Sequence, residues 1–238
     1  MPGSMKADFH LSRRELIQKA GLTLGFIPPA LGLFLDPRNA AADPFQGARK
    51  DRTSLRELLM EMDAKGHQFW SVPWKDGEFL HFMVKATGSR HLLEMGTSHG
   101  FSAIWMALAL EETDGRLVTI EIDSERIKLA RHNIGRAGLS HRVTLVKGDG
   151  HAEIPKLHGP FDFIFLDADK GKEIDYFKKL YPQKLQLGGI LTIHNAISQA
   201  RSLKPYLEMI QKHPDFDTVI LSATMDDGLC LSYRRRAS

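Results

Sequence analysis

The sequence is poor in several features that would point to particular classes of protein. It has a single cysteine, Cys230, so no internal disulfide can form and no cysteine pair is available for a metal site. The net charge is only +3, and residues 43–238 hold 27 basic against 26 acidic side chains, which leaves no basic surface for nucleic acid. No internal repeat or low-complexity tract is present. We therefore expect one soluble globular domain with Cys230 as a small core residue.

The N-terminal segment reads as a secretion signal rather than as part of a fold. Arg13 and Arg14 precede an apolar stretch, residues 20–35, which contains glycine and a proline pair and is followed by three alanines. This order resembles a twin-arginine signal. The apolar stretch is too short and too interrupted for a stable membrane span. We expect residues 1–42 to be a cleaved signal and residues 43–238 to be exported to the periplasm; the alternatives are an amphipathic N-terminal helix and a cytoplasmic protein.

The rest of the chain alternates between strand-like and helix-like segments. Short apolar runs predict strands at 91–96, 116–123, 142–149, 161–169, 188–196, 217–223 and 229–235. Helical periodicity predicts helices at 53–66, 77–86, 102–112, 124–138, 170–185 and 200–213. Such alternation predicts an α/β fold with a doubly wound, mostly parallel sheet of seven strands, preceded by a helical cap. The motif TMDDG between the last two strands predicts a final antiparallel hairpin.

A glycine-rich turn follows the first predicted strand. The segment LLEMGTSHGFS holds Glu94, Gly96, Gly100 and Ser102 between a strand and a helix. Its G-x-x-x-G spacing differs from the G-x-G-x-x-G fingerprint of dinucleotide-binding proteins. Glycines at such a turn allow backbone N–H groups to approach a ligand beside a helix N-terminus. By itself the turn is a weak signal, because many strand–helix turns need glycine.

Acidic residues follow the next two strands. Glu121 ends the second strand and can accept hydrogen bonds from both hydroxyls of a ribose. Asp149 ends the third strand, where it can bind the amino group of an adenine. Because ligands of open α/β sheets lie at the carboxyl ends of the strands, the three strand ends together predict a nucleoside site.

Five motifs in order resemble the class I S-adenosylmethionine-dependent O-methyltransferases, most closely the catechol and caffeoyl-CoA type. The motifs are LLEMGTSHGFSAIWMA, VTIEID, VTLVKGDGHAEIPKL, FDFIFLDADK and LGGILTIHN. The resemblance implies that S-adenosylmethionine is the cofactor and that the first motif takes its methionine part. The cofactor-binding residues that it implies are Glu94, Gly96, Thr97, Ser98, Gly100, Ser102, Glu121, Ile122, Gly148, Asp149, Gly150 and Asp167.

Polar residues at two further strand ends predict a metal site. Asp167 follows one buried strand, and His194 and Asn195 follow another. A carboxylate, an imidazole and an amide oxygen on one edge of a sheet can together hold a divalent ion. In the family that the chain resembles, Mg²⁺ is held by an aspartate matching Asp167 and by an Asp-Asn pair, and it binds both oxygens of a catechol.

The pair His194-Asn195 departs from that family pattern. Imidazole in place of a carboxylate removes a negative charge and makes Mn²⁺, Fe²⁺ or Zn²⁺ more plausible than Mg²⁺. Two alternatives remain open. His194 can be a general base with a pKa near neutrality and no metal beside it. His194 and Asn195 can instead be structural and bind only backbone groups.

Lys170 is the candidate base for the acceptor hydroxyl. It stands three residues after Asp167, as does the family lysine that helps deprotonate the acceptor. The alternative is a solvated lysine at the start of a helix. Asp169 is expected to cap that helix.

The acceptor follows from the resemblance more than from any residue. A small phenolic or catechol-like molecule is expected, and Trp70, Pro73, Trp74 and Trp105 can form aromatic walls for it or pack in the helical cap. The alternatives are an exported protein that binds S-adenosylmethionine without transferring its methyl group, and a methyltransferase acting on nitrogen or on a protein. A homodimer is one option for the assembly, and the sequence does not decide it.

Overall fold

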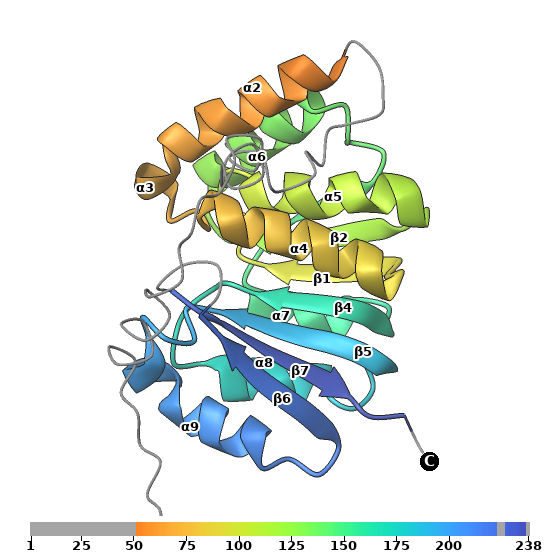
Figure 1. Ribbon diagram of the computed structural model, residues 1–238, viewed down its shortest axis with the longest axis vertical. Coiled ribbons are helices and arrows are strands. Elements are labelled where there is room, and N and C mark those ends of the chain that lie inside the picture. The colour runs from red at the N-terminus through yellow and green to blue at the C-terminus, as the bar shows by residue number, and fades with distance from the viewer. Residues whose placement is uncertain (1–50, 223–226, 237–238) are drawn as a thin grey trace, which may run out of the picture. The chain divides into compact units, whose positions relative to one another are not determined.

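A single seven-stranded sheet organises the part of the chain that the structure describes, residues 51–222 and 227–236 of the computed structural model (Figure 1). The strand order is β3-β2-β1-β4-β5-β7-β6. The strands are β1 (His91–Met95), β2 (Arg116–Glu121), β3 (Val143–Lys147), β4 (Phe161–Leu166), β5 (Leu185–His194), β6 (Phe216–Leu221) and β7 (Leu229–Arg234). The first five pair in parallel, while β7 runs antiparallel to both β5 and β6. The predicted mostly parallel sheet with an antiparallel end is thus confirmed.

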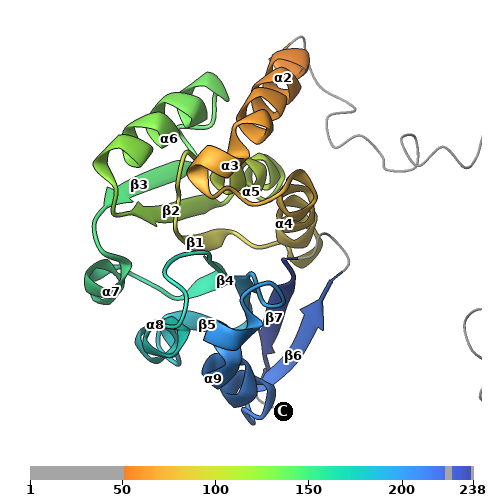
Figure 2. The same cartoon turned by 90° about the vertical axis from the view of Figure 1, so that its left-hand side faces the viewer.

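Helices cover both faces of this sheet. They are α2 (Asp51–Ala64), α3 (Gly66–Phe69), α4 (Trp74–Thr87), α5 (Phe101–Thr113), α6 (Ser124–Arg136), α7 (Gly150–Glu153), α8 (Glu173–Leu180) and α9 (Ala200–Gln211), with a 3₁₀ turn, η2, at Ile154–Lys156. Helices α2, α4, α5 and α6 pack with one another, and α7 and α9 each pack against α8. Figure 2 shows α4 and α5 on the opposite side of the sheet from α7 and α8. The strand ends between the two groups are left for the site.

Burial in the core explains why apolar runs in the sequence predicted the strands. Central strands β1 and β4 are apolar and buried along almost their whole length, as expected for strands covered on both faces. Cys230 lies fully buried on β7, as predicted, and burial raises the pKa of its thiol to about 11. Helix α5 is buried nearly all round, and its Trp105 is fully buried.

Some boundaries differ from the predicted ones. Helix α2 begins at Asp51 and α4 at Trp74, each earlier than expected. For α4, Pro73 is the N-cap and has an extended backbone, so the helix starts at the next residue. The predicted helix over 170–185 is confined to Glu173–Leu180, since Leu185 already pairs with Phe161 in the sheet. The predicted signal, residues 1–42, and most of the TMDDG turn lie outside the described residues. Among the described helices, none is long and apolar enough to span a membrane.

Candidate functional site

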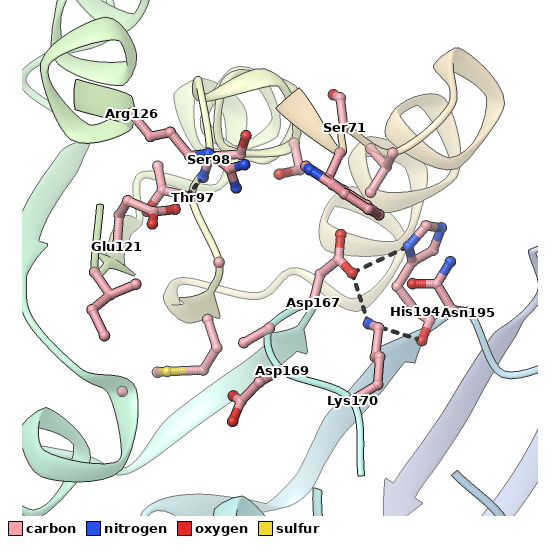
Figure 3. A pocket seen from close by; sticks show the side chains of 18 of the residues that line it. Ser71, Thr97, Ser98, Glu121, Arg126, Asp167, Asp169, Lys170, His194 and Asn195 are labelled. Carbon is pink, nitrogen blue, oxygen red and sulfur yellow. Dashed lines mark hydrogen bonds and ion pairs between the residues drawn. The ribbon is translucent and has the colours of Figure 1, made fainter. Parts of the chain in front are cut away.

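A cavity of about 820 Å³ opens at the carboxyl ends of β1, β2, β4 and β5 (Figure 3). It brings together most of the residues that the sequence nominated. Those lining it are Gly96, Thr97, Ser98, Ser102, Glu121, Ile122, Gly148, Asp149, Gly150, Asp167, Lys170, His194 and Asn195. Of the residues nominated for the cofactor or a metal, Glu94 and Gly100 do not line it. The volume lies in the range that binds a small-molecule ligand.

The glycine turn after β1 packs closely against the backbone at the end of β4. Gly96 has φ +91°, and a Cβ at this position would lie 2.2 Å from the backbone oxygen of Asp167. Gly100 has φ +95° and lies against Ala130 of α6. The left-handed conformation and the close backbone approach both require glycine. The turn therefore brings the ends of β1 and β4 together on one side of the cavity.

Glu121 is held at the cavity wall by backbone donors. Ser98 N–H donates to one carboxylate oxygen at 2.7 Å, and Asp123 N–H donates to the other at 2.9 Å. Both bonds fix the carboxylate plane while leaving each oxygen a further lone pair. Its neighbour Ile122 has an exposed side chain in the same lining. A fixed acid beside an apolar surface is the arrangement expected for a ribose with an adjoining base.

Glu94 lies fully buried and is not part of the cavity lining. Ser102 and Thr119 donate hydroxyl hydrogen bonds to its two oxygens, at 2.5 and 2.6 Å. Burial raises the pKa of Glu94 to about 7, against the lowering effect of these two bonds. Glu94 therefore lies beneath the cavity wall and orients Ser102, which lines the cavity.

Asp149 caps the N-terminus of α7 and accepts a hydrogen bond from the backbone N–H of His151 at 2.8 Å. His151 stacks on the ring of Tyr176, with ring centroids 3.9 Å apart. Tyr176 donates to Asp169 at 2.7 Å. The prediction that Asp169 caps the next helix is therefore wrong: it binds a side chain of α8 instead, and Glu173 accepts the nearby Gly171 N–H.

A compact charged cluster forms the other end of the cavity. Lys170 Nζ lies 2.8 Å from Asp167 Oδ1 and 3.4 Å from the backbone oxygen of His194. His194 Nδ1 lies 3.3 Å from the same Asp167 oxygen (Figure 3). Burial acts to raise the pKa of Asp167, but the charges of Lys170 and His194 outweigh it and hold that pKa well below its usual range.

His194 is more basic than an ordinary histidine. Burial acts to lower its pKa, but the charge of Asp167 and hydrogen bonds with Asp167 and Asp76 raise it to about 9. A ring with that pKa is charged at neutral pH when no other cation is near. This argues against the alternative in which His194 is a neutral-pH base on its own.

Two acidic neighbours of His194 were not anticipated from the sequence. Asp76 of α4 is fully buried, and its Oδ2 lies 2.9 Å from His194 Nε2. Asp227 Oδ2 lies 4.0 Å from the same nitrogen. Asp76 precedes His194 by 118 residues and sits in a helix, so no strand-end argument could reveal it.

Asn195, the third predicted metal ligand, lies beside His194 at the end of β5 (Figure 3). Its backbone is left-handed, with φ +63°, a conformation that asparagine tolerates better than most residues. Its side-chain amide nitrogen donates to Ser198 Oγ at 3.2 Å. The amide group is thus oriented by its nitrogen, and no hydrogen bond from the described residues occupies its oxygen, which can act as an acceptor or ligand.

The aromatic residues separate into two groups. Trp70 lines the cavity and is 81% exposed. Trp74 and Trp105 instead pack edge to face, with ring centroids 5.1 Å apart, and neither lines the cavity. The packing alternative therefore holds for Trp74 and Trp105, while Trp70 is placed to meet a ligand.

Sequence comparisons place the chain beside known methyltransferases. Residues 46–229 match the model of the family described as O-methyltransferase. A catechol O-methyltransferase from Mycobacterium tuberculosis is 31% identical over 84% of this chain and 92% of its own. Caffeoyl-CoA O-methyltransferase 1 from Zea mays is 30% identical over 75% of this chain and 72% of its own.

Solved structures of O-methyltransferases have a similar fold. The O-methyltransferase TomG from Streptomyces achromogenes, in complex with SAM, has a TM-score of 0.66 and 27% identity, covering 76% of this chain and 90% of its own. An O-methyltransferase from Bacillus cereus, in complex with SAH, has a TM-score of 0.69 and 26% identity, covering 87% of this chain and 97% of its own.

Proposed function

Because the chain belongs to the O-methyltransferase family, we propose that it transfers the methyl group of S-adenosylmethionine to a hydroxyl oxygen of a small phenolic or catechol-like acceptor. One observation carries the proposal. A single cavity has a fixed acid, Glu121, at one end and the Asp167–Lys170–His194 cluster at the other. This pairing suits a nucleoside cofactor held next to a hydroxyl that must lose a proton.

The cofactor end is assigned to the residues that line it on β1, β2 and α7. Glu121 accepts the ribose hydroxyls, Ile122 offers an apolar surface to the adenine, and Asp149 lies where it can accept the adenine amino group. The backbone of Gly96 and the hydroxyl of Ser102 face the methionine part. Two similar proteins contain SAM or SAH in their solved structures, which supports this assignment.

The acceptor end uses Lys170 as the proton-handling group. In the transfer, the acceptor oxygen forms a bond to the methyl carbon, the sulfur–carbon bond breaks and S-adenosylhomocysteine leaves. Lys170 first gives a proton to solvent, and its amine then accepts the hydroxyl proton; Asp167, 2.8 Å away, holds the ammonium with which the cycle starts and ends. The remaining role of the protein is to align oxygen, carbon and sulfur and to exclude water.

A divalent cation fits the donor atoms at this end. Asp167 Oδ1 and His194 Nδ1 are 3.3 Å apart, close to the ~3 Å separation of neighbouring ligands around a six-coordinate ion with bonds of about 2.1 Å. Asp167, His194 and Asn195 would hold it, and the mixed oxygen and nitrogen donors favour Mn²⁺, Fe²⁺ or Zn²⁺ over Mg²⁺. When bound, the ion supplies positive charge that favours the ionised form of the acceptor hydroxyl.

Calorimetric titration with S-adenosylmethionine tests the cofactor end first. We expect micromolar binding by the full chain and a loss of at least about tenfold in the Glu121→Ala variant. The matched control is Glu125→Ala, an acidic residue on α6 that does not line the cavity. Absence of binding by the folded wild-type chain would overturn the proposal.

Methylation of phenols and catechols, with Mg²⁺ and Mn²⁺ in turn, tests the acceptor end. We expect the Lys170→Met variant to lose at least about a hundredfold in kcat while keeping its affinity for S-adenosylmethionine. If the chain binds S-adenosylmethionine but methylates no phenol with either metal, the alternatives gain support: a binding protein without transfer activity, or a nitrogen or protein acceptor.

A further inference from the structure

The far side of the His194 ring carries an interaction that the proposed reaction does not yet use. Asp76 Oδ2 lies 2.9 Å from His194 Nε2, and both side chains are almost completely buried. The other oxygen of Asp76 has no hydrogen-bond partner among the described residues. Within the described chain, His194 is therefore the one side chain that compensates this buried carboxylate.

The two ring nitrogens face different surroundings. Nε2 points to Asp76, which does not line the cavity, whereas Nδ1 points to Asp167, which does. An Nε2–H donated to Asp76 leaves the Nδ1 lone pair directed to the cavity. Histidines that bind metal ions commonly donate their second ring N–H to a carboxylate, which fixes the tautomer and makes the ligating nitrogen more electron-rich.

We propose that Asp76 is a positioning residue for a divalent cation: it holds the His194 ring through Nε2–H so that Nδ1 joins Asp167 in binding the ion. The inference rests on the proposed function, because it assigns a role within the metal-assisted site. Asp76 also adds charge. Neutral His194 brings none, but the His194–Asp76 pair carries one negative charge, which lies beyond the imidazole ring and one hydrogen bond from the cation.

A second arrangement around the same ring is chemically reasonable and less favoured. Asp76, His194 and Asp227 each offer one atom, all within 4.8 Å of one another, and could hold an ion on the Nε2 side. There, however, Nε2 and Asp76 already lie at the distance of a direct hydrogen bond. Asp227 is the residue that separates the two arrangements, because only the second one uses it as a ligand.

Binding of Mn²⁺ alone to the full chain, followed by electron paramagnetic resonance, tests the proposal without relying on activity. Asp76→Asn keeps an oxygen that can accept the Nε2–H but removes the charge, so the fold should be retained. We expect it to weaken Mn²⁺ binding about 10- to 100-fold. The matched control Asp227→Asn should stay within about twofold of wild type. Loss of Mn²⁺ binding in both variants would overturn the proposal and place the ion on the Nε2 side.

A double substitution distinguishes positioning from mere packing. His194→Asp brings a carboxylate directly to the ion and removes the ring that Asp76 holds. In that chain Asp76 has no ring nitrogen to position, so its substitution should matter little. We therefore expect Asp76→Asn to weaken Mn²⁺ binding about 10- to 100-fold in the wild-type chain and by no more than about threefold in the His194→Asp chain.

An equally large loss in both backgrounds would show that Asp76 does not act through the His194 ring, contrary to the proposal. A wild-type chain that binds no Mn²⁺ yet methylates phenols in excess EDTA would also overturn it. That last result would leave the proposed methyl transfer standing, so the two failures are distinguishable.

Discussion

At the scale of single residues, Glu94 shows how burial can make one carboxyl sensitive to pH. It lies beneath the cavity, and its only hydrogen-bond donors among the described side chains are two neutral hydroxyls, of Ser102 and Thr119. Burial dominates and raises its pKa to about 7 from the usual value of 4.5. The folded chain therefore keeps this proton over a range of pH in which the unfolded chain has lost it.

The stability of the chain should fall as the pH rises through this range. Because the folded state binds more protons than the unfolded state between about pH 4.5 and 7, its free energy of unfolding decreases with pH there. At about 1.4 kcal/mol per unit, the decrease due to Glu94 is of the order of 3 kcal/mol. Urea unfolding of wild type and Glu94→Gln from pH 5 to 8, in EDTA, measures the difference. A difference that stays constant with pH would contradict the assignment.

Gly96 allows a test of the close approach between β1 and β4. An alanine Cβ there would lie 2.2 Å from the backbone oxygen of Asp167, so the strand ends would have to separate. Gly138 is a matched control, since it also has a positive φ, +73°, but a Cβ there would meet nothing within 4 Å. We expect Gly138→Ala to cost about 1–2 kcal/mol of unfolding free energy and Gly96→Ala at least ~2 kcal/mol more, by urea unfolding. Equal losses would show that the approach is not tight.

The residues of the site differ in how far the sequence could reveal them. Asp167 and His194 were predictable because the carboxyl ends of parallel strands meet at one edge of the sheet, whereas Lys170 was nominated by the family resemblance. Asp76 was not, since it lies on a helix and its meeting with His194 depends on how α4 packs. Asp169 was assigned wrongly because helix capping is a local rule, whereas the hydrogen bond from Tyr176 depends on tertiary packing.

At the scale of elements, the segment from α3 to α4 forms one wall of the cavity. Phe69, Trp70, Ser71 and Val72 all line it. Ser98 Oγ donates to the backbone oxygen of Phe69 at 2.5 Å, which ties this segment to the glycine turn. Trp70 ends α3 in a left-handed conformation and holds its ring in solvent. An exposed aromatic ring at a cavity wall suits stacking against a flat acceptor.

Removing that ring should weaken acceptor binding selectively. We expect Trp70→Ala to raise the KM for a phenolic acceptor about 2- to 13-fold, which corresponds to the ~0.5–1.5 kcal/mol of an aromatic pair. The Kd for S-adenosylmethionine should not change. Phe82→Ala serves as the control, because Phe82 is an exposed aromatic residue on α4 that does not line the cavity. If both variants have the wild-type KM, Trp70 does not contact the acceptor.

The elements themselves were largely predictable, and their ends were not. Strands such as β1 (HLLEM) and β4 (FDFIFL) are short and mostly apolar, and this composition is typical of strands that are buried on both faces. The start of β5 was missed because residues 185–189 contain two glycines and a glutamine, which break the apolar run although the backbone already pairs with β4. Pairing between distant strands fixed that boundary, and no local pattern contains this information.

At the scale of the whole molecule, the order of elements was enough to predict a mostly parallel seven-stranded sheet that ends in an antiparallel hairpin. Alternating strands and helices followed by two consecutive strands lead to that architecture. The strand order, with β7 between β5 and β6, was not predicted, because a hairpin requires only that β6 and β7 be neighbours. The packing of side chains around the site could not be predicted in the same way. The contact between the His194 ring and Asp76 depends on how α4 packs beside β5, and neither composition nor periodicity contains this information.

Export is the whole-molecule property that residues 1–42 predict, and it can be tested in a bacterium with a twin-arginine translocase. We expect the chain to appear in the periplasm with these residues removed, and to stay in the cytoplasm at full length in a strain that lacks the translocase. Arg13→Lys combined with Arg14→Lys keeps the charge but removes the arginine pair, so it should reduce export at least about tenfold. Arg38→Lys, outside the pair, is the matched control and should be exported normally. Cell fractionation with mass spectrometry measures both. Full-length protein confined to the cytoplasm of the wild-type strain would mean that the segment is not a signal, and the enzyme would then work where S-adenosylmethionine is made.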